Sequence, residues 1–147
     1  MDVKSAFLHG TIKEDIYMRK PEGIEGNNDL VCKLNKALYG LKQAPLNWNN
    51  RFNEFAKSRQ LRRSENDPCL YVKLSEQKIL YLLIYVDDII IASNDLKEIE
   101  NLKDKLTKTF EMTDMGDLTQ FLGINIRRSE DEIYLRGSLS ERRTPTK

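Results

Sequence analysis

A pair of adjacent acids between two apolar runs is the feature that most constrains the fold of this chain. Eight residues, Ile79 to Val86, precede Asp87 and Asp88, and four, Ile89 to Ala92, follow them. β-Branched and aromatic residues are frequent in both runs, so the segment predicts an apolar β-hairpin with two carboxylates at its tip. An uncompensated charge in apolar surroundings costs on the order of several kcal/mol, which favours a bound cation. A solvent-exposed turn is the alternative, because Asp is common in turns.

Two amphipathic helices are predicted, one on each side of this hairpin. The first has Pro45 in its first turn, and it places aromatic residues at i, i+4 and i+7: Trp48, Phe52 and Phe55. The second begins after Asp95, which forms an N-cap box with Glu98. Its apolar positions follow at helical spacing: Leu96, Ile99, Leu102, Leu106 and Phe110. Each helix therefore has one apolar face.

Short apolar runs predict further strands at residues 16–18, 31–34, 69–72, 120–126 and 133–135. In the middle of the chain the order strand, helix, hairpin, helix, strand is typical of an α+β fold. It matches the ferredoxin-like split β-α-β antiparallel sheet with helices on one face. The strand before the first helix must lie at or before Met1 and Asp2. We therefore expect the fold to be incomplete at its N-terminal strand and Asp2 to be mobile.

Composition limits the number of domains and the class of partners. The 147 residues include 24 basic and 23 acidic ones, which leaves room for one domain and argues against a surface that binds nucleic acid everywhere. No apolar stretch approaches the roughly 20 residues of a membrane-spanning helix, so no membrane partner is expected. We expect one domain over residues 1–135 and a flexible basic tail over 136–147.

Asp2 is a third acid with apolar neighbours, far in sequence from the acidic pair. Three carboxylates converge if the fold brings Asp2 to the hairpin tip. Oxygen ligands of this kind suit Mg²⁺, which takes one or two protein carboxylates and completes its shell with water and phosphates. Two such ions about 4 Å apart would activate an attacking hydroxyl and stabilise a leaving pyrophosphate.

Three segments resemble the polymerase motifs of a known family, in the family's order. Met1 to Gly10 is similar to motif A, Leu38 to Pro45 to motif B, and Tyr85 to Asp88 to motif C of the reverse transcriptase of Ty1/copia-type retrotransposons. The similarity extends to about Leu135. This resemblance implies a polymerase palm from a Pol polyprotein, truncated at both ends. It also implies RNA-directed DNA polymerase activity, the transfer of a nucleotide from a dNTP to a primer 3′-hydroxyl.

The resemblance implies catalytic and metal-binding roles for the three acids. Asp2 and Asp87 would bridge two Mg²⁺ ions, with Mn²⁺ as the alternative metal, and Asp88 would be the supporting acid beside them. The primer hydroxyl would attack the α-phosphate in line. Most of the rate would then come from positioning and electrostatic stabilisation.

A second set of implied residues binds the nucleotide: Phe7, Gly40, Lys42, Gln43 and Tyr85. The ring of Phe7 would exclude a ribose 2′-hydroxyl, and the motif B turn would contact the incoming nucleotide and the template. From the pattern alone, Phe7 is a core residue and motif B is an ordinary strand-to-helix turn. In that turn Gly40 would permit close backbone approach.

Phe121, Leu122 and Gly123 are implied to form the primer grip, which holds the primer backbone near the metals. The alternative is an amphipathic strand that closes the core. A basic run over residues 57–63 is expected to be solvated surface rather than a template contact.

The implied partners are an RNA or DNA template with its primer and dNTPs. The finger, thumb and RNase H segments of the polyprotein are expected to be missing from the chain. The family implies a cytoplasmic location in virus-like particles, with the nucleus as a second possibility. The alternative function is that of a catalytically inactive, retrotransposon-derived remnant that at most binds nucleic acid or protein.

Overall fold

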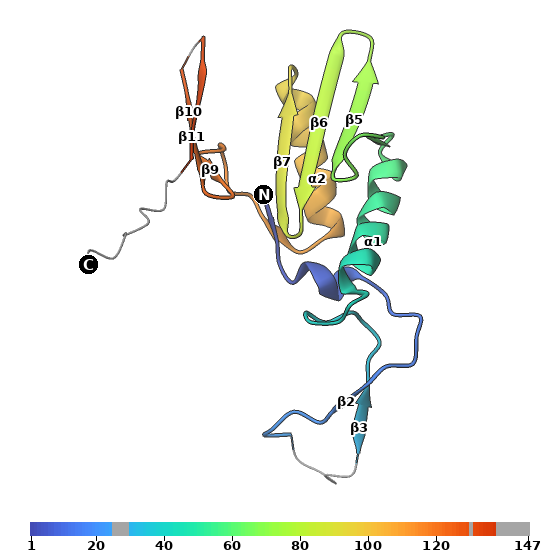
Figure 1. Ribbon diagram of the computed structural model, residues 1–147. Helices are drawn as coiled ribbons and strands as arrows, with labels where there is room; N and C mark the ends of the chain where they lie inside the picture. The colour runs from blue at the N-terminus through green and yellow to red at the C-terminus, as the bar shows by residue number, and fades with distance from the viewer. Residues whose placement is uncertain (25–29, 130, 138–147) are drawn as a thin grey trace, which may run out of the picture. The chain divides into compact units, whose positions relative to one another are not determined.

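The computed structural model describes residues 1–24, 30–129 and 131–137 (Figure 1). The chain divides into two compact units, residues 1–114 and 115–147. The first contains β1 (Asp2–Val3), the 3-10 helix η1 (Ala6–His9), β2 (Tyr17–Arg19), β3 (Val31–Lys33), α1 (Ala44–Ser58), β4 (Arg62–Arg63), β5 (Leu70–Ser75), β6 (Lys78–Tyr85), β7 (Asp88–Ser93), α2 (Leu96–Thr109) and β8 (Met112–Thr113). The second contains β9 (Gln120–Phe121), β10 (Ile124–Arg128) and β11 (Ile133–Gly137). The fold is α+β with mostly antiparallel sheets, as predicted, and no described helix is long and apolar enough to cross a membrane.

A six-stranded sheet in the order β4-β5-β6-β7-β1-β8 organises the first unit. All its neighbouring strands are antiparallel. The predicted apolar hairpin is confirmed, because β6 and β7 pair from Leu80 opposite Ser93 to Tyr85 opposite Asp88. A two-residue turn of Val86 and Asp87 joins them. The acidic pair therefore lies at one end of the two central strands.

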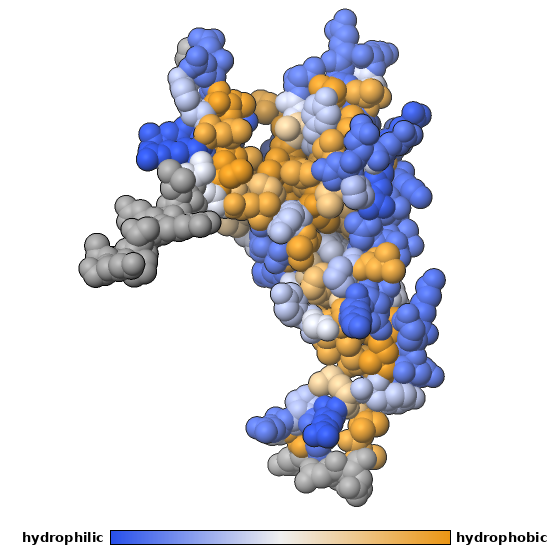
Figure 2. All heavy atoms as spheres, in the orientation of Figure 1, coloured by the Kyte–Doolittle hydropathy of each residue, from blue (hydrophilic) through white to orange (hydrophobic). Residues whose placement is uncertain are grey.

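Both helices pack on one face of this sheet (Figure 1). The predicted aromatic face of α1 is buried: Trp48, Phe52 and Phe55 are each at most 4% exposed. Side chains alternate between the faces of a strand, so the buried Leu80 and Leu82 of β6 face the helices while Tyr81, between them, points the other way. That other face carries many hydrophobic atoms over β6 and β7 (Figure 2). The core therefore lies between one sheet face and the two helices.

The N-terminal cap of α2 is also as predicted. The Asp95 carboxylate accepts a hydrogen bond from the Lys97 backbone N–H at 2.9 Å. Leu102 and Leu106 of the apolar stripe are buried. Leu96 keeps helical spacing but is exposed, because it is the first residue after the cap and lies beyond the edge of the core.

The expectation that Asp2 lacks strand neighbours is wrong. β1 has only two residues, yet it lies between β7 and β8, with Asp2 opposite Asp88 on one side and Thr113 on the other. The Val3 N–H donates to the Asp87 carbonyl at 2.8 Å, and the Val3 side chain is 2% exposed. Two residues are enough because pairing on both sides and a buried side chain hold them. The short β8, which the sequence analysis does not predict, closes this edge.

A peripheral hairpin confirms two predicted strands. β2 and β3 pair with Tyr17 opposite Lys33 and Arg19 opposite Val31. The bounds differ from the expected ones by a single residue at each of three ends. Part of the segment that connects these strands, residues 25–29, lies outside the described residues.

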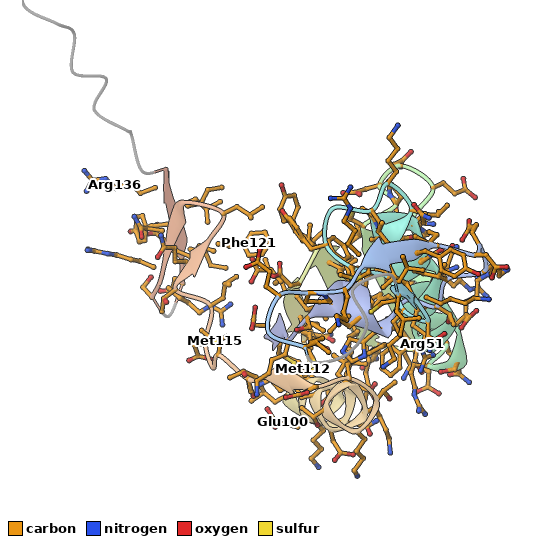
Figure 3. All side chains as sticks on the ribbon, turned by 90° about the horizontal axis from the view of Figure 1, so that it is seen from below. Arg51, Glu100, Met112, Met115, Phe121 and Arg136 are labelled. Carbon is orange, nitrogen blue, oxygen red and sulfur yellow. The ribbon has the colours of Figure 1, made fainter. Side chains whose placement is uncertain are left out.

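The second unit is a three-stranded sheet in the order β11-β10-β9. The predicted pairing of residues 120–126 with 133–135 is confirmed in part, with Ile126 opposite Leu135. The strand predicted over 120–126 is interrupted, because Leu122 and Gly123 form a turn between β9 and β10. Figure 3 labels Phe121 and Arg136 on this unit. Arg136 and Gly137, expected to begin the tail, belong to β11. The rest of the predicted tail, 138–147, lies outside the described residues.

Candidate active site

Three acids meet at the end of the central hairpin. Asp2 on β1 and Asp88 on β7 are directly opposite each other, so their side chains share one face of the sheet. This is the face that the helices leave open. Asp87 precedes Asp88 in the turn and is exposed, whereas the other two acids are half-buried. The register of β1 thus brings the acid of motif A to the acids of motif C.

The acids also interact electrostatically. Partial burial raises the pKa of Asp88 above its usual value, and the negative charges of Asp87 and Asp2 raise it further. The Met1 amino group opposes this shift. No Lys or Arg side chain in the described part of the chain forms an ion pair with any of the three carboxylates. The group formed by Asp2, Asp87 and Asp88, the acid corner, therefore has excess negative charge.

The three carboxylates have the right chemistry for a divalent cation, but they are not close enough together to surround one. The described residues contain no group of three His, Cys, Asp or Glu side chains close enough to hold a metal ion together. The three carboxylates nevertheless supply only oxygen donors, as Mg²⁺ prefers, and they repel one another without a cation. Asp2, Asp87 and Asp88 are thus the residues that could hold a metal here.

The turn that carries Asp87 is held from two sides. Val86 has φ +57°, a conformation that is strained for a β-branched residue. The Trp48 indole N–H donates to the Val86 carbonyl at 2.6 Å, and the Val3 N–H donates to the next carbonyl, that of Asp87. The aromatic spacing along α1 predicts Trp48 only as a core residue. Helical spacing cannot predict a hydrogen bond to a turn 38 residues away.

A pocket of about 270 Å³ lies beside Asp87. Its lining comes from all three motif segments: Ser5, Ala6, Phe7, Leu8, Leu38, Tyr39, Val86 and Asp87. The rings of Phe7 and Tyr39 contact each other, with their centroids 5.5 Å apart. Phe7 is half-buried and also packs against the core, so it satisfies both the core interpretation and the pocket interpretation. Tyr39 is a pocket residue that the sequence analysis leaves without a role.

The other predicted nucleotide-binding residues lie around this pocket rather than in its lining. Gly40 has φ +97°, and a Cβ there would meet no protein atom within 4 Å, so backbone conformation rather than close packing requires glycine. Lys42 is exposed and Gln43 half-buried, in the last turn before α1. Tyr85 is 51% exposed and lies opposite Asp88.

The predicted primer-grip residues belong to the second unit. Phe121 ends β9, and the turn to β10 has positive φ at both Leu122 and Gly123. Their role in holding a primer stays a prediction.

Comparison with known proteins shows which family has this combination of segments. A family model described as reverse transcriptase (RNA-dependent DNA polymerase) matches residues 1–138. The chain belongs to this reverse transcriptase family. The resemblance to the Ty1/copia-type enzymes is thus confirmed at the level of the family, and the acid corner is the place where the segments similar to motifs A and C meet.

Its curated relatives are transposon proteins. The chain is 50% identical, over 87% of its length, to the retrovirus-related Pol polyprotein from transposon TNT 1-94 of Nicotiana tabacum, and covers 10% of that protein. It is 40% identical, over 89% of its length, to a putative transposon Ty5-1 protein of Saccharomyces cerevisiae, and covers 43% of it. It is 39% identical, over 92% of its length, to the Pol polyprotein from transposon RE1 of Arabidopsis thaliana, and covers 9% of it. No solved structure matches the chain.

Proposed function

We propose that the first unit is a polymerase palm and that its acid corner supports RNA-directed DNA synthesis. The observation that carries this proposal is the register that places Asp2 opposite Asp88, with Asp87 beside them in the turn. The strand order supports the palm assignment. β6, β7, β1 and β8 are neighbours, with α1 between β1 and β6 in the chain and α2 between β7 and β8. This is the order of a β-α-β-β-α-β unit.

In this proposal, Asp2 and Asp87 hold two divalent ions, Mg²⁺ or Mn²⁺, and Asp88 supports them. When bound, such ions supply charge neutralisation to a phosphoryl group that is being transferred. The chain's own residues position the reactants. Asp87 lines the pocket beside Phe7, so a nucleotide in this pocket would place its sugar on the Phe7 ring and its phosphates toward the acids.

The remaining predicted contacts follow from the surroundings of the pocket. The turn around Gly40, Lys42 and Gln43 lies next to Tyr39, which lines the pocket, and would contact the nucleotide and the template. Tyr85 would contact the nucleotide from the exposed sheet face. The turn of Leu122 and Gly123 in the second unit would hold the primer. RNA or DNA template, primer and dNTPs are the partners of this reaction.

Primer extension tests the proposal. The purified chain should extend a DNA primer on an RNA template with Mg²⁺ or Mn²⁺, and Asp87→Asn should reduce the rate at least about 100-fold, because it removes a charge at the reacting centre. Asp104→Asn is the control, because this carboxylate lies on the exposed face of α2 and pairs with Lys108. Extension that survives Asp87→Asn, or a wild-type chain that extends no primer with either metal, would refute the proposal.

A second function is favoured because the carboxylates of the acid corner, among the described residues, are not close enough together to hold a metal ion. In that case the chain is catalytically inactive and binds nucleic acid or protein. It would shift an RNA–DNA hybrid in a salt-dependent manner without extending the primer. Absence of binding at low salt would exclude the nucleic-acid form of this alternative.

A further inference from the structure

Trp48 joins the helix that follows motif B to the turn of motif C. Its side chain is 2% exposed, and its indole N–H donates to the Val86 carbonyl at 2.6 Å. A buried N–H group needs a partner, and here that partner is the turn that carries Asp87. This hydrogen bond therefore gives the buried indole N–H a partner, and it also connects α1 to the turn of the candidate site.

The turn depends on such support. Val86 has φ +57°, which a β-branched residue adopts only where its surroundings enforce it. The Val86 carbonyl accepts from Trp48, and the Asp87 carbonyl accepts from the Val3 N–H at 2.8 Å. Two successive carbonyls are thus held by two different elements, which orients the two peptide planes on either side of the Asp87 Cα atom.

Trp48 also contacts the segment that carries motif A. Its ring lies 5.8 Å from the ring of His9, centroid to centroid. At Gly10, a Cβ would come within 2.9 Å of Asn47 Cβ and 3.0 Å of the Trp48 backbone nitrogen. The first turn of α1 is therefore in close contact with the end of η1, and Trp48 contacts the segments of both Asp2 and Asp87.

We propose that Trp48 is a positioning residue that holds the Val86–Asp87 peptide through its indole N–H and so aims the Asp87 carboxylate at the corner shared with Asp2. The claim about the turn stands on the hydrogen bond alone. The claim about metal binding rests on the proposed function.

Hydrogen exchange tests the first claim. Trp48→Phe keeps a buried ring and removes only the donor, whereas Phe55→Leu is the control, because Phe55 is a buried aromatic residue of the same helix whose described contacts are with other rings and Arg59. Trp48→Phe should make the Val3 amide, which bonds to Asp87, exchange about tenfold faster, and Phe55→Leu should leave the ratio of Val3 exchange to global exchange unchanged. An unchanged Val3 amide in Trp48→Phe would overturn the proposal.

The wild-type chain offers a measurement that needs no variant. Trp48 is the only tryptophan, so the protein gives a single indole N–H signal in NMR spectra. This signal should be strongly protected from exchange with solvent. An indole proton that exchanges like that of free tryptophan would overturn the proposal even if Trp48→Phe does not fold.

Titration with Mn²⁺ tests the second claim. Trp48→Phe should weaken Mn²⁺ binding about tenfold relative to the wild type, and Phe55→Leu should not weaken it. Unchanged Mn²⁺ affinity in Trp48→Phe would refute the positioning of the metal ligand. A wild-type chain that binds no Mn²⁺ would instead refute the metal-dependent function, and the exchange measurements would still decide the role of Trp48 in the turn.

Discussion

At the scale of single residues, the acid corner combines a functional arrangement with an energetic cost. Asp88 is half-buried, and its pKa is raised by partial burial and by the charges of Asp87 and Asp2. Repulsion among three carboxylates destabilises the metal-free fold, which is typical of sites selected for function rather than stability. The corner should therefore gain stability when one charge is removed.

Asp88→Asn should raise the free energy of unfolding by about 0.5 kcal/mol at pH 7 in EDTA, a small figure because the site is partly solvated. Since the folded pKa lies above 3.8, the native state binds the proton more tightly than the unfolded state. The contribution of Asp88 to wild-type stability should therefore fall as the pH rises from about 3.8 through the raised pKa, and the advantage of the variant should vanish at lower pH. Urea titrations at several pH values measure both effects.

Asp104→Asn is the control of opposite sign. The Lys108 ammonium at 2.8 Å lowers the pKa of Asp104, so this substitution should slightly destabilise the protein at pH 7. If both variants shift stability in the same direction, the repulsion at the acid corner is not the cause.

At the scale of elements, the start of α2 is tied to the hairpin that carries the site. The Asp95 carboxylate caps the helix and pairs with Lys78 of β6 at 2.6 Å. Lys73 of β5 pairs with Glu98 in the first turn at 3.0 Å. Both ion pairs join this helix to strands of the central sheet. The capping box predicted from sequence thus has a tertiary role as well.

Substitutions at Asp95 should separate its cap from its charge. Bonds from Lys78 and from the Lys97 backbone lower the pKa of Asp95, so its ionised form adds stability above pH 3.8 that is lost as the pH falls through the lowered pKa. Asp95→Asn keeps a capping oxygen and loses the charge, whereas Asp95→Ala loses both. At pH 7 we expect thermal stability in the order wild type, Asn, Ala.

The pH dependence provides the decisive comparison. The gap between the wild type and Asp95→Asn should close below the folded pKa, while the gap between the Asn and Ala variants should persist. Equal melting temperatures for the Asn and Ala variants would show that the cap contributes nothing.

At the scale of the whole molecule, the chain has one principal core, and it belongs to the first unit. All fully buried hydrophobic residues in the described part of the chain lie between Val3 and Phe110. Arg51 of α1 makes a cation–π contact with the Phe110 ring at 5.6 Å. At the end of this unit, Asp114 forms an ion pair with Lys103 of α2 at 3.1 Å. Among the described residues of the β9–β11 unit, none is fully buried.

A chain that ends at Asp114 should therefore fold. We expect it to melt cooperatively within about 5 °C of the full chain in calorimetry, because the core and the six-stranded sheet remain whole. Phe52→Ala in this shortened chain is the control, because it removes a fully buried ring and should abolish or strongly lower the transition. Loss of cooperative melting in the unsubstituted shortened chain would show that the second unit is part of the core.

Local patterns were sufficient for the main elements. The aromatic spacing of Trp48, Phe52 and Phe55 predicts α1, and the apolar runs around Asp87 predict the central hairpin. The strands β4 and β8 have two residues each and show no periodicity, so they could not be predicted. Their pairing depends on neighbours that are distant in sequence. β9 falls within the strand predicted over residues 120–126, but its separation from β10 could not be predicted.

The sequence by itself determined the family, the three acids and the two amphipathic helices, because these depend on residue identity and on spacing along the chain. Only the tertiary structure decided that Asp2 is held between two strands, that Phe7 and Tyr39 share a pocket with Asp87, and that Trp48 donates to the turn. Each of these contacts joins segments that are far apart in the chain. Such contacts form when the sheet register and the helix packing bring the segments together, so the spacing of residues along the chain does not predict them.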